Sequence, residues 1–519
     1  MSRTETVWWE TRWFAALAIL LALVPLLLPT VPPLTDLAGH IGRYRVMLGT
    51  DADALSQFYS YQWRFVGNLG VDLIVAGLSP LIGLEPAVKS AVLLTVGLTA
   101  SGILWISREA HGRVQPWALL ALPLAYNYAF HFGFVNHCFA MALALNAFAL
   151  WLRLGRQEQF RLRASIFVPL AVLVWIAHIV GWGALCLMIY GAELARARGQ
   201  GRGWPAAIFH AGIGCLPLAL PFVLLILWRS NESHGDSVTH HFFDFQFKAG
   251  WLAMVFRDRW PEFDMASAAL IAILLYRGFR SDRVAKSPAL VAASLLLLLA
   301  FVLLPFMLFM SAFADMRLAP YLVALALLSL GAGETMSFRE KSAMAMIGLA
   351  FFGARIAGNT ASLWLHGRNW ERHLAALDHV PRGSRLVSFV GQDCAKPWSD
   401  RRTSHLPGLA TARRAAFSND QWRLGGSTPL KIVVTGLHDF DGDPSQMVMA
   451  DWCAAEPSYL PLAVALARVP RAHADYVWLI DPPAFDPRLV AGMTPIWRND
   501  SDVLYRIDNH RLSGTNPPH

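Results

Sequence analysis

The polar residues with the clearest chemical potential follow the first apolar segment of the chain. Residues 36–43 read Asp-Leu-Ala-Gly-His-Ile-Gly-Arg, and in a helix Asp36, His40 and Arg43 would share one face. A carboxylate can take a proton from a hydroxyl group, while imidazole and guanidinium groups can stabilise an anion. The segment therefore predicts a site for proton transfer beside an anion. A second interpretation is also open, in which Asp36 stabilises a helix N-terminus and the other two side chains lie near lipid head groups.

A second polar group, in residues 126–137, alternates aromatic side chains with amides and imidazoles. Tyr and Phe side chains at a membrane interface form an aromatic belt that needs no further function. A belt accounts less well for Asn127, Asn136 and His137, because polar groups at the ends of membrane spans usually face a protein interior or a wet cavity. We interpret these three as candidate substrate-binding residues.

Three more candidates lie at turns between apolar segments. Asp315 and Arg317 open one such segment, where an arginine can clamp a phosphate with two hydrogen bonds or extend its charged head to the interface. His178 separates two apolar halves and is either a substrate-binding or a structural histidine. Residues 234–248 form a loop that could cover a site as a lid or lie in solvent; its polar side chains include His240, His241, Asp244 and Lys248.

The elements that must position these residues are apolar. Of 519 residues, 55% are hydrophobic and only 15% are charged, and the mean hydropathy of +0.40 is too high for a soluble domain of this size. Several apolar runs in the first 365 residues are long enough to cross about 30 Å of hydrocarbon. The first run lacks a small-residue cleavage site, so we expect it to remain as an anchor. The chain is predicted to be a polytopic α-helical membrane protein with about eleven spans.

Lysine and arginine residues predict the orientation of these spans. They gather in five short clusters, at residues 108–113, 153–163, 196–202, 277–286 and 339–341. Short basic loops resist translocation, and all five are cytoplasmic if the N-terminus is cytoplasmic and two conditions hold. Residues 65–83 must lie at the interface, and residues 164–194 must form two short spans that turn at 177–181. The same pattern explains the net charge of +8 without a nucleic-acid partner.

The composition changes after residue 365, where polar residues become dense. Short β-type runs occur at residues 385–390, 430–436, 475–480 and 502–507, and residues 459–467 are compatible with a helix. This alternation predicts an extracytoplasmic α/β domain over residues 366–519. It would follow a membrane domain of residues 1–365 with outer loops at 31–90 and 230–263.

Two of the five cysteines lie in the predicted outer domain, which would be in an oxidising compartment, and none has metal-binding spacing. Cys394 and Cys453 are the only cysteines outside the expected spans, so they are a disulfide candidate; two buried thiols are the alternative. No zinc-type Cys/His spacing is present. The acidic turn at residues 439–443 lacks the register and closing glutamate of a calcium loop. We therefore expect neither a metal nor a cofactor.

The chain resembles the GT-C superfamily of polyprenyl-phosphate-sugar-dependent glycosyltransferases. The shared features are a first helix leading into an outer loop with a membrane-proximal acid, interfacial helices before the second span, short paired spans and an outer C-terminal domain. Residues 36–43, Tyr126-Asn127 with residues 133–136, and residues 177–181 resemble a bacterial branch of such proteins. The resemblance implies inverting transfer of a sugar from a polyprenyl phosphate to an envelope glycan, lipid or protein. The reaction would occur at the outer face of the bacterial inner (plasma) membrane.

The resemblance also implies roles for individual residues. Asp36 matches the family's acidic position and would be the base, Arg317 would bind the donor phosphate, and His40 and Arg43 would support either role. The sequence shows no second acid beside Asp36 and no Asp-x-Asp pair in residues 230–263, which favours a mechanism without metal.

Two other functions remain open from the sequence: a transporter or flippase of a lipid-linked or polar substrate, and a non-catalytic assembly or sensor protein. Transporters usually bind substrate near the midplane and contain repeated halves. Here the polar residues gather at one face and no repeat is visible, which favours the transferase. The missing second acid keeps the non-catalytic interpretation open.

Overall fold

The computed structural model describes residues 7–49, 53–230, 239, 241–308, 312–395, 397–423 and 428–508. The chain divides into two compact units. Unit 1 comprises Met1–Thr30, Phe65–Ile74 and Lys89–Trp364, and unit 2 comprises Val31–Arg64, Val75–Val88 and Leu365–His519. The loop after the first helix therefore belongs to the same unit as the C-terminal third of the chain.

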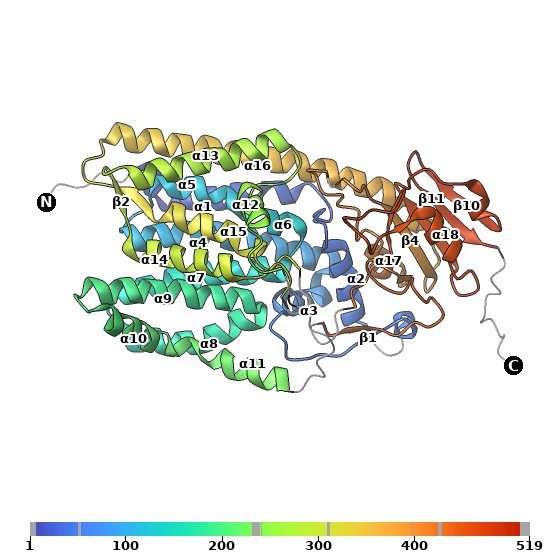
Figure 1. The fold of residues 1–519 in the computed structure, drawn as a ribbon, viewed down its shortest axis with the longest axis horizontal. Coiled ribbons are helices and arrows are strands. Elements are labelled where there is room, and N and C mark those ends of the chain that lie inside the picture. Colours follow the sequence, from blue (N-terminus) through green and yellow to red (C-terminus); the bar gives the residue numbers. More distant parts are fainter. Residues whose placement is uncertain are drawn as a thin grey trace. The chain divides into compact units, whose positions relative to one another are not determined.

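Unit 1 is a bundle of apolar helices, many of which run side by side (Figure 1). Its main helices are α1 (Arg12–Leu27), α4 (Leu84–His111), α5 (Pro116–Ala121), η3 (Leu122–Tyr126), α6 (Tyr128–Phe132), α7 (Val135–Arg156), α8 (Phe160–Ala177), α9 (Ile179–Gly199), α10 (Trp204–Gly214), α11 (Leu220–Ser230), α12 (Phe245–Ala253), α13 (Pro261–Arg280), α14 (Pro288–Leu303), η5 (Met316–Leu318), α15 (Ala319–Leu328) and α16 (Phe338–Leu374). Proline opens α5, α13 and α14, where its missing N–H would have no helical partner.

The outer faces of these helices are also apolar. Exposed side chains such as Leu20, Phe209 and Leu299 would be unfavourable in water but suit a lipid surround. Among the described residues, α4, α7, α8 and α9 have the length and hydropathy of membrane spans, and the bent pair of α10 and Leu216–Ile226 is a fifth candidate. Several shorter helices, including α1 and α14, are apolar as well. The helical membrane class expected from the sequence is confirmed, whereas the number of crossings stays a prediction.

Small residues allow the helices of unit 1 to approach closely. A Cβ atom at Gly181 would lie 2.6 Å from the Cβ of Ala140, and one at Gly191 would lie 2.6 Å from the backbone nitrogen of Ala293. Glycine is therefore required where α9 contacts α7 and α14. Such contacts are the usual source of helix association in a membrane, since burial from lipid gains no hydrophobic free energy.

The chain turns where the sequence predicted paired spans. Helix α8 ends at Ala177 and α9 begins at Ile179, and the His178 between them is extended, with φ −169° and ψ 133°. The Nδ1 atom of His178 accepts a hydrogen bond from the backbone N–H of Val180, 3.1 Å away, which caps α9. Within the expected interfacial segment the structure forms α3 (Gly70–Ile82).

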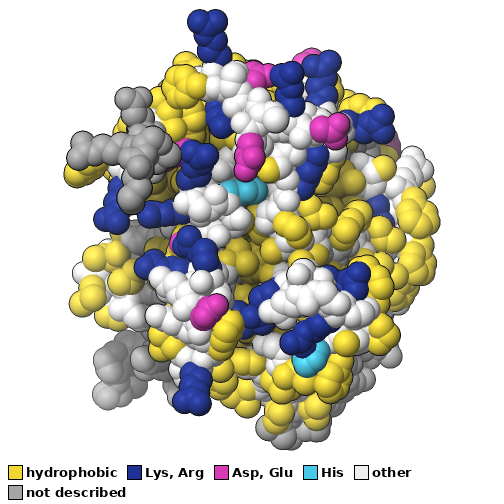
Figure 2. Space-filling view, turned by 90° about the vertical axis from the view of Figure 1, so that its left-hand side faces the viewer, with side chains coloured by type: hydrophobic (Ala, Val, Ile, Leu, Met, Phe, Trp, Pro, Cys, Tyr) yellow, Lys and Arg dark blue, Asp and Glu magenta, His cyan; other side chains and the backbone are white. Residues whose placement is uncertain are grey.

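The basic clusters meet at one end of unit 1. Strand β2 (Val284–Lys286) pairs with β3 (Leu330–Ala332) there, and Arg283 binds Glu340 at 2.8 Å. Further ion pairs at the helix ends join Arg156 to Glu109 and Arg163 to Glu193. Figure 2 views the molecule from the side on which β2 lies in Figure 1, and shows lysine and arginine side chains spread across this face. One end of the bundle is thus strongly basic.

Unit 2 is built on a mixed sheet with the strand order β10-β11-β9-β4-β7-β8, in which β5 also pairs with β4. The strands are β4 (Arg385–Gly391), β5 (Phe417–Ser418), β7 (Met447–Met449), β8 (Leu460–Pro461), β9 (Tyr476–Ile480), β10 (Met493–Arg498) and β11 (Val503–Ile507). Strand β4 runs parallel to β5, β7 and β9, whereas β11 is antiparallel to both of its neighbours, β9 and β10. The expected C-terminal region with a sheet is therefore present.

Segments from the early part of the chain complete unit 2. They contribute α2 (Leu37–Met47) and β1 (Tyr59–Tyr61), and β1 pairs with β6 (Leu430–Ile432). Helix α17 (Gly408–Arg414) packs on α2, and α18 (Leu462–Arg468) lies beside the sheet. Buried side chains from both parts, such as Phe58, Phe389 and Leu466, share one core.

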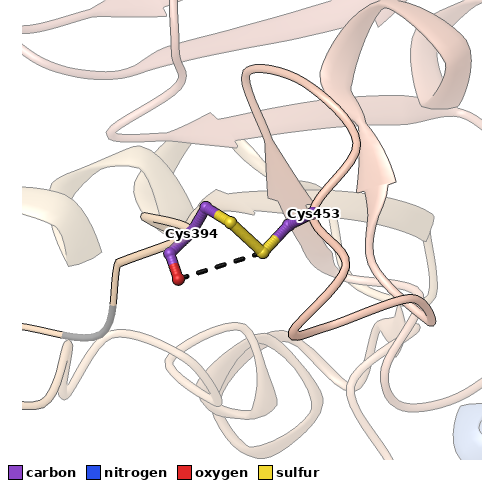
Figure 3. The surroundings of a disulfide bond; sticks show 2 residues. All are labelled: Cys394 and Cys453. Atoms are coloured by element: carbon purple, nitrogen blue, oxygen red, sulfur yellow. Dashed lines mark hydrogen bonds between the residues drawn. A yellow bond between two sulfur atoms is a disulfide. The ribbon is translucent and has the colours of Figure 1, made fainter.

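A disulfide joins Cys394, which follows β4, to Cys453, which follows β7 (Figure 3). It closes a sequence separation of 59 residues, with the two Cα atoms 5.6 Å apart. The other cysteines, Cys138, Cys186 and Cys215, are free thiols in the helices and turns of unit 1.

Removing this disulfide should destabilise unit 2. Replacing Cys394 and Cys453 together by serine is expected to lower its free energy of unfolding by about 4 kcal/mol, because a cross-link over a loop of this length restricts the unfolded chain. Thiol labelling in denaturant without reductant should leave both cysteines unmodified, whereas the free Cys186 should react. Labelling of both cysteines without reductant would contradict the bond.

Candidate active site

Asp36 lies at the start of α2, within unit 2. It occupies the N-cap position, but its side chain makes no capping hydrogen bond. The carboxylate is 12% exposed, and its Oδ1 atom lies 3.9 Å from Nε2 of His405. A buried carboxylate needs a positive or hydrogen-bonding partner to remain ionised. His405, from the C-terminal part of unit 2, is such a partner.

His405 faces three carboxylates that come from separate segments. Its Nε2 atom lies 3.8 Å from Oδ1 of Asp443, and its Nδ1 atom lies 4.0 Å from Oδ2 of Asp420 and 3.2 Å from the Asp420 carbonyl oxygen. Burial alone would lower the pKa of His405, but Asp443, Asp36 and Asp420 outweigh it and raise this pKa above its ordinary value. Burial raises the pKa of Asp420 to about 6.

Three glycines let α2 reach the segment that carries these groups. A Cβ at Gly39 would lie 2.8 Å from the Trp422 ring, and one at Gly42 would lie 2.7 Å from the carbonyl oxygen of Gly408. The Nε2 atom of Gln421 donates to the Gly39 carbonyl oxygen at 3.0 Å. The glycines of residues 36–43 thus serve close packing within unit 2.

The ring of Trp422 lies next to both histidines, 4.8 Å from His40 and 4.6 Å from His405 between ring centroids. Burial, together with Arg43 and His405, holds the pKa of His40 well below its usual range. The neutral form of His40 is therefore favoured in this structure, and its supporting role at the site stays a prediction. Arg43, whose guanidinium lies 4.9 Å from the Tyr44 ring, keeps its charge.

Three of the predicted residues in unit 1 lie together. The rings of His137 and His178 are 5.4 Å apart, and His137 Nε2 lies 3.2 Å from the carbonyl oxygen of Arg317. The Arg317 guanidinium lies 4.2 Å from the centroid of the Phe134 ring. These residues come from α7, the break before α9 and η5, and they form a polar group among apolar helices.

The remaining three candidates have partners within the protein that account for their burial. Asn136 accepts a hydrogen bond from the Val71 N–H at 2.6 Å and donates to Asp72 at 2.9 Å, so it anchors α3. Asn127 accepts from the Phe130 N–H and caps α6. Asp315 binds Lys248 Nζ at 3.0 Å.

The sequence prediction missed His405, Asp420 and Asp443. The acidic turn at residues 439–443 contains Asp443 and was interpreted as a turn without function. The expectation that Asp36 has no acidic neighbour holds along the sequence but not in the fold, where Asp420 and Asp443 share His405 with it. Of the predicted lid, residues 234–238 and His240 lie outside the described residues, and Lys248 is buried on Asp315.

One group of side chains within the described ranges has ligand atoms close enough together for a metal ion: His373, Asp481 and Asp502. His373 Nδ1 donates to Asp502 at 2.6 Å, and its Nε2 lies 2.9 Å from Nδ2 of Asn369. Both ring nitrogens thus have protein partners. We interpret His373 as a buried, hydrogen-bonded side chain that connects α16 to Asp502 beside the sheet.

Comparison with known proteins identifies the fold. No protein-family model matches the chain, and neither does any curated protein. Two solved structures of ArnT from Cupriavidus metallidurans, one apo and one bound to undecaprenyl phosphate, are similar at a TM-score of 0.50 and 12% identity, covering 95% of this chain and 97% of that chain. The mycobacterial arabinofuranosyltransferase AftD aligns with a TM-score of 0.45 and 15% identity, over 96% of this chain and 42% of its own. The GT-C fold expected from the sequence is confirmed.

The close approach of α2 to α17 predicts that Gly42 is required for unit 2 to fold. Gly42→Ala should destabilise this unit by about 1 to 3 kcal/mol, because the new methyl group meets a backbone carbonyl that cannot rotate away. Gly77→Ala, at an exposed position of α3 with open space around it, is the matched control and should be neutral or slightly stabilising. Thermal unfolding in detergent measures both. Equal melting temperatures for the two variants would contradict the packing argument.

Proposed function

We propose that the protein is a membrane glycosyltransferase that moves a sugar from a polyprenyl-phosphate donor to an acceptor at the outer face of the bacterial inner membrane. The observation that carries the proposal is the Asp36 carboxylate, held beside His405 in a chain with a GT-C fold. The solved ArnT complex with undecaprenyl phosphate supports the donor class. The acceptor would be a glycan, lipid or protein of the envelope.

The chemistry needs one base and a cationic environment. An acceptor hydroxyl attacks the anomeric carbon of the donor sugar and gives its proton to Asp36. The bond from that carbon to the phosphate oxygen breaks, and the polyprenyl phosphate leaves as an anion that needs cations rather than an acid. A single displacement of this kind inverts the anomeric configuration.

Arginines are the candidates for holding the donor phosphate. Arg317, grouped with His137 and His178, is our choice in unit 1, and Arg43 contributes positive charge in unit 2. Arginine suits the role because its guanidinium stays charged and can bind phosphate through two hydrogen bonds. Asn127, Asn136 and Asp315 are assigned to support of the fold.

We further propose about eleven crossings, with the basic end of unit 1 in the cytoplasm. The crossings would be α1, α4, α5 with η3, α7, α8, α9, α10 with α11, α13, α14, α15 and α16. The division into units supports this, because residues 31–64 and the C-terminal third belong to one unit and so lie on one side. An even number of crossings must then separate them. The C-terminal domain of residues 366–519 would be periplasmic, and the N-terminus cytoplasmic.

The first prediction of this proposal concerns the base. Asp36→Asn should reduce sugar transfer about 10²- to 10⁴-fold, since an amide keeps the size of the carboxylate but cannot accept a proton. Asp53→Asn is the matched control: Asp53 also lies in unit 2 but binds Arg45 at 2.5 Å, and its loss should leave transfer nearly unchanged. Turnover of a radiolabelled polyprenyl-phosphate sugar by purified protein measures both.

Donor binding and sugar transfer should depend on different residues. Asp36→Asn should still retain polyprenyl phosphate, whereas Arg317→Ala should lose it. An Asp36→Asn protein that inserts normally and transfers sugar at the wild-type rate would remove Asp36 from the mechanism.

The second prediction concerns sidedness. A reporter enzyme that is active only outside the cytoplasm, fused after residue 519, should be active, because the proposed number of crossings is odd. The same reporter fused within the basic cluster at residues 196–202 should be inactive. Activity of a cytoplasm-only reporter at residue 519 would contradict the threading.

A further inference from the structure

The Nε2 atom of His405 lies almost midway between two carboxylates, 3.9 Å from Oδ1 of Asp36 and 3.8 Å from Oδ1 of Asp443. Its Nδ1 atom faces the Asp420 carbonyl oxygen at 3.2 Å. Every one of these neighbours is a hydrogen-bond acceptor. A neutral imidazole has one N–H donor, whereas an imidazolium has a donor on both nitrogens. One acceptor lies at hydrogen-bond distance from Nδ1 and two carboxylates lie at ion-pair distance from Nε2, which suits a ring with a proton on both nitrogens.

The surrounding charges favour the same state. The side chain of His405 is 7% exposed, and the ring is fixed between the Asp420 backbone and the Trp422 ring. Charged and titratable groups reach this region from each element packed around it: Asp36, His40, Arg43, Arg402, Asp420, Asp443, Glu456 and Tyr459. The carboxylates that face the ring outnumber the arginines, so a proton on His405 balances the local charge.

We propose that His405 carries a proton in the resting protein and is a positioning residue that keeps Asp36 ionised, with Asp443 as the second carboxylate sharing its charge. The inference rests on the proposed function for the role of Asp36 as a base. His405 acts through Asp36 and takes no part in bond making.

This arrangement sets a pH window for the reaction. Asp36 must be ionised to accept a proton, and His405 must be protonated to hold it. Because the carboxylates raise the pKa of His405, the positive charge is lost only as the pH rises through that raised value. Activity should therefore fall on the alkaline side of the pH profile, because His405 loses its proton there.

The first arm of the test does not depend on activity. The full-length protein is labelled with ¹³C at Cε1 of histidine, placed in lipid nanodiscs and titrated by NMR, and the His405 signal is assigned by its loss in His405→Gln. The titration midpoint should lie above the ordinary value of 6.5 and should fall in Asp36→Asn and in Asp443→Asn, because each variant removes a carboxylate that raises it. Asp53→Asn should not move it. A midpoint at or below 6.5, or one that Asp36→Asn leaves unchanged, overturns the inference.

The second arm measures transfer from a polyprenyl-phosphate sugar against pH. His405→Gln should lower kcat at least tenfold with an unchanged KM for the donor, and its alkaline limb should disappear. His405→Lys, which keeps a cation with a higher pKa, should restore activity and move the limb to higher pH. A variant that loses activity but keeps the wild-type alkaline limb overturns the inference, since a purely structural role would give that result.

The two arms separate the inference from the proposed function. The His405 midpoint could fall in Asp36→Asn while the wild-type protein transfers no sugar. The proposed function would then fail, and the protonated state of His405 beside Asp36 would stand. If Asp36→Asn abolishes transfer while the His405 midpoint does not respond, the inference fails and the function stands.

Discussion

The close approach of α2 to the segment that carries His405 is the constraint on which the packing of Asp36 in unit 2 depends. A carboxylate with so little exposure is costly unless a cation lies next to it. His405, the printed neighbour of the Asp36 carboxylate, comes from the far end of the sequence, and α2 packs against the segment that contains Gly408, Gln421 and Trp422. The glycines of α2 exist because this approach leaves no room for side chains. Residues 31–64 are consequently part of unit 2, and their buried side chains belong to its core.

This dependence also constrains how the chain crosses the membrane. Residues 31–64 and 365–519 form one unit, and a single folded unit occupies one side of a bilayer. The helices between them must cross an even number of times, whichever of the shorter ones are counted as spans. The threading proposed from the basic end of unit 1 also places an even number of crossings between these two segments.

Local patterns were predictable from the sequence, and contacts between distant segments were not. The break at His178 and strands such as β4, β9 and β11 follow from apolar periodicity and length. His405 was missed because it is an isolated polar residue in a loop, and Asp443 was missed because the acidic turn that contains it matches no known metal loop and its contact with His405 is not visible in the sequence. The partners of Asn136 on α3, which account for its burial, are not visible in the sequence either, and its predicted role in substrate binding stays a prediction. A polar residue beside an apolar span is thus a weak guide to function until its partners are known.

The central claim is that the protein binds a polyprenyl-phosphate-linked sugar. Native mass spectrometry of the full-length protein, purified from bacterial inner membranes in a mild detergent, tests it most directly. The account predicts a bound species with the mass of a polyprenyl phosphate or its glycosylated form, present on the wild-type protein and depleted on Arg317→Ala. A wild-type protein that carries only bulk phospholipids, and takes up no added undecaprenyl phosphate, would contradict the account.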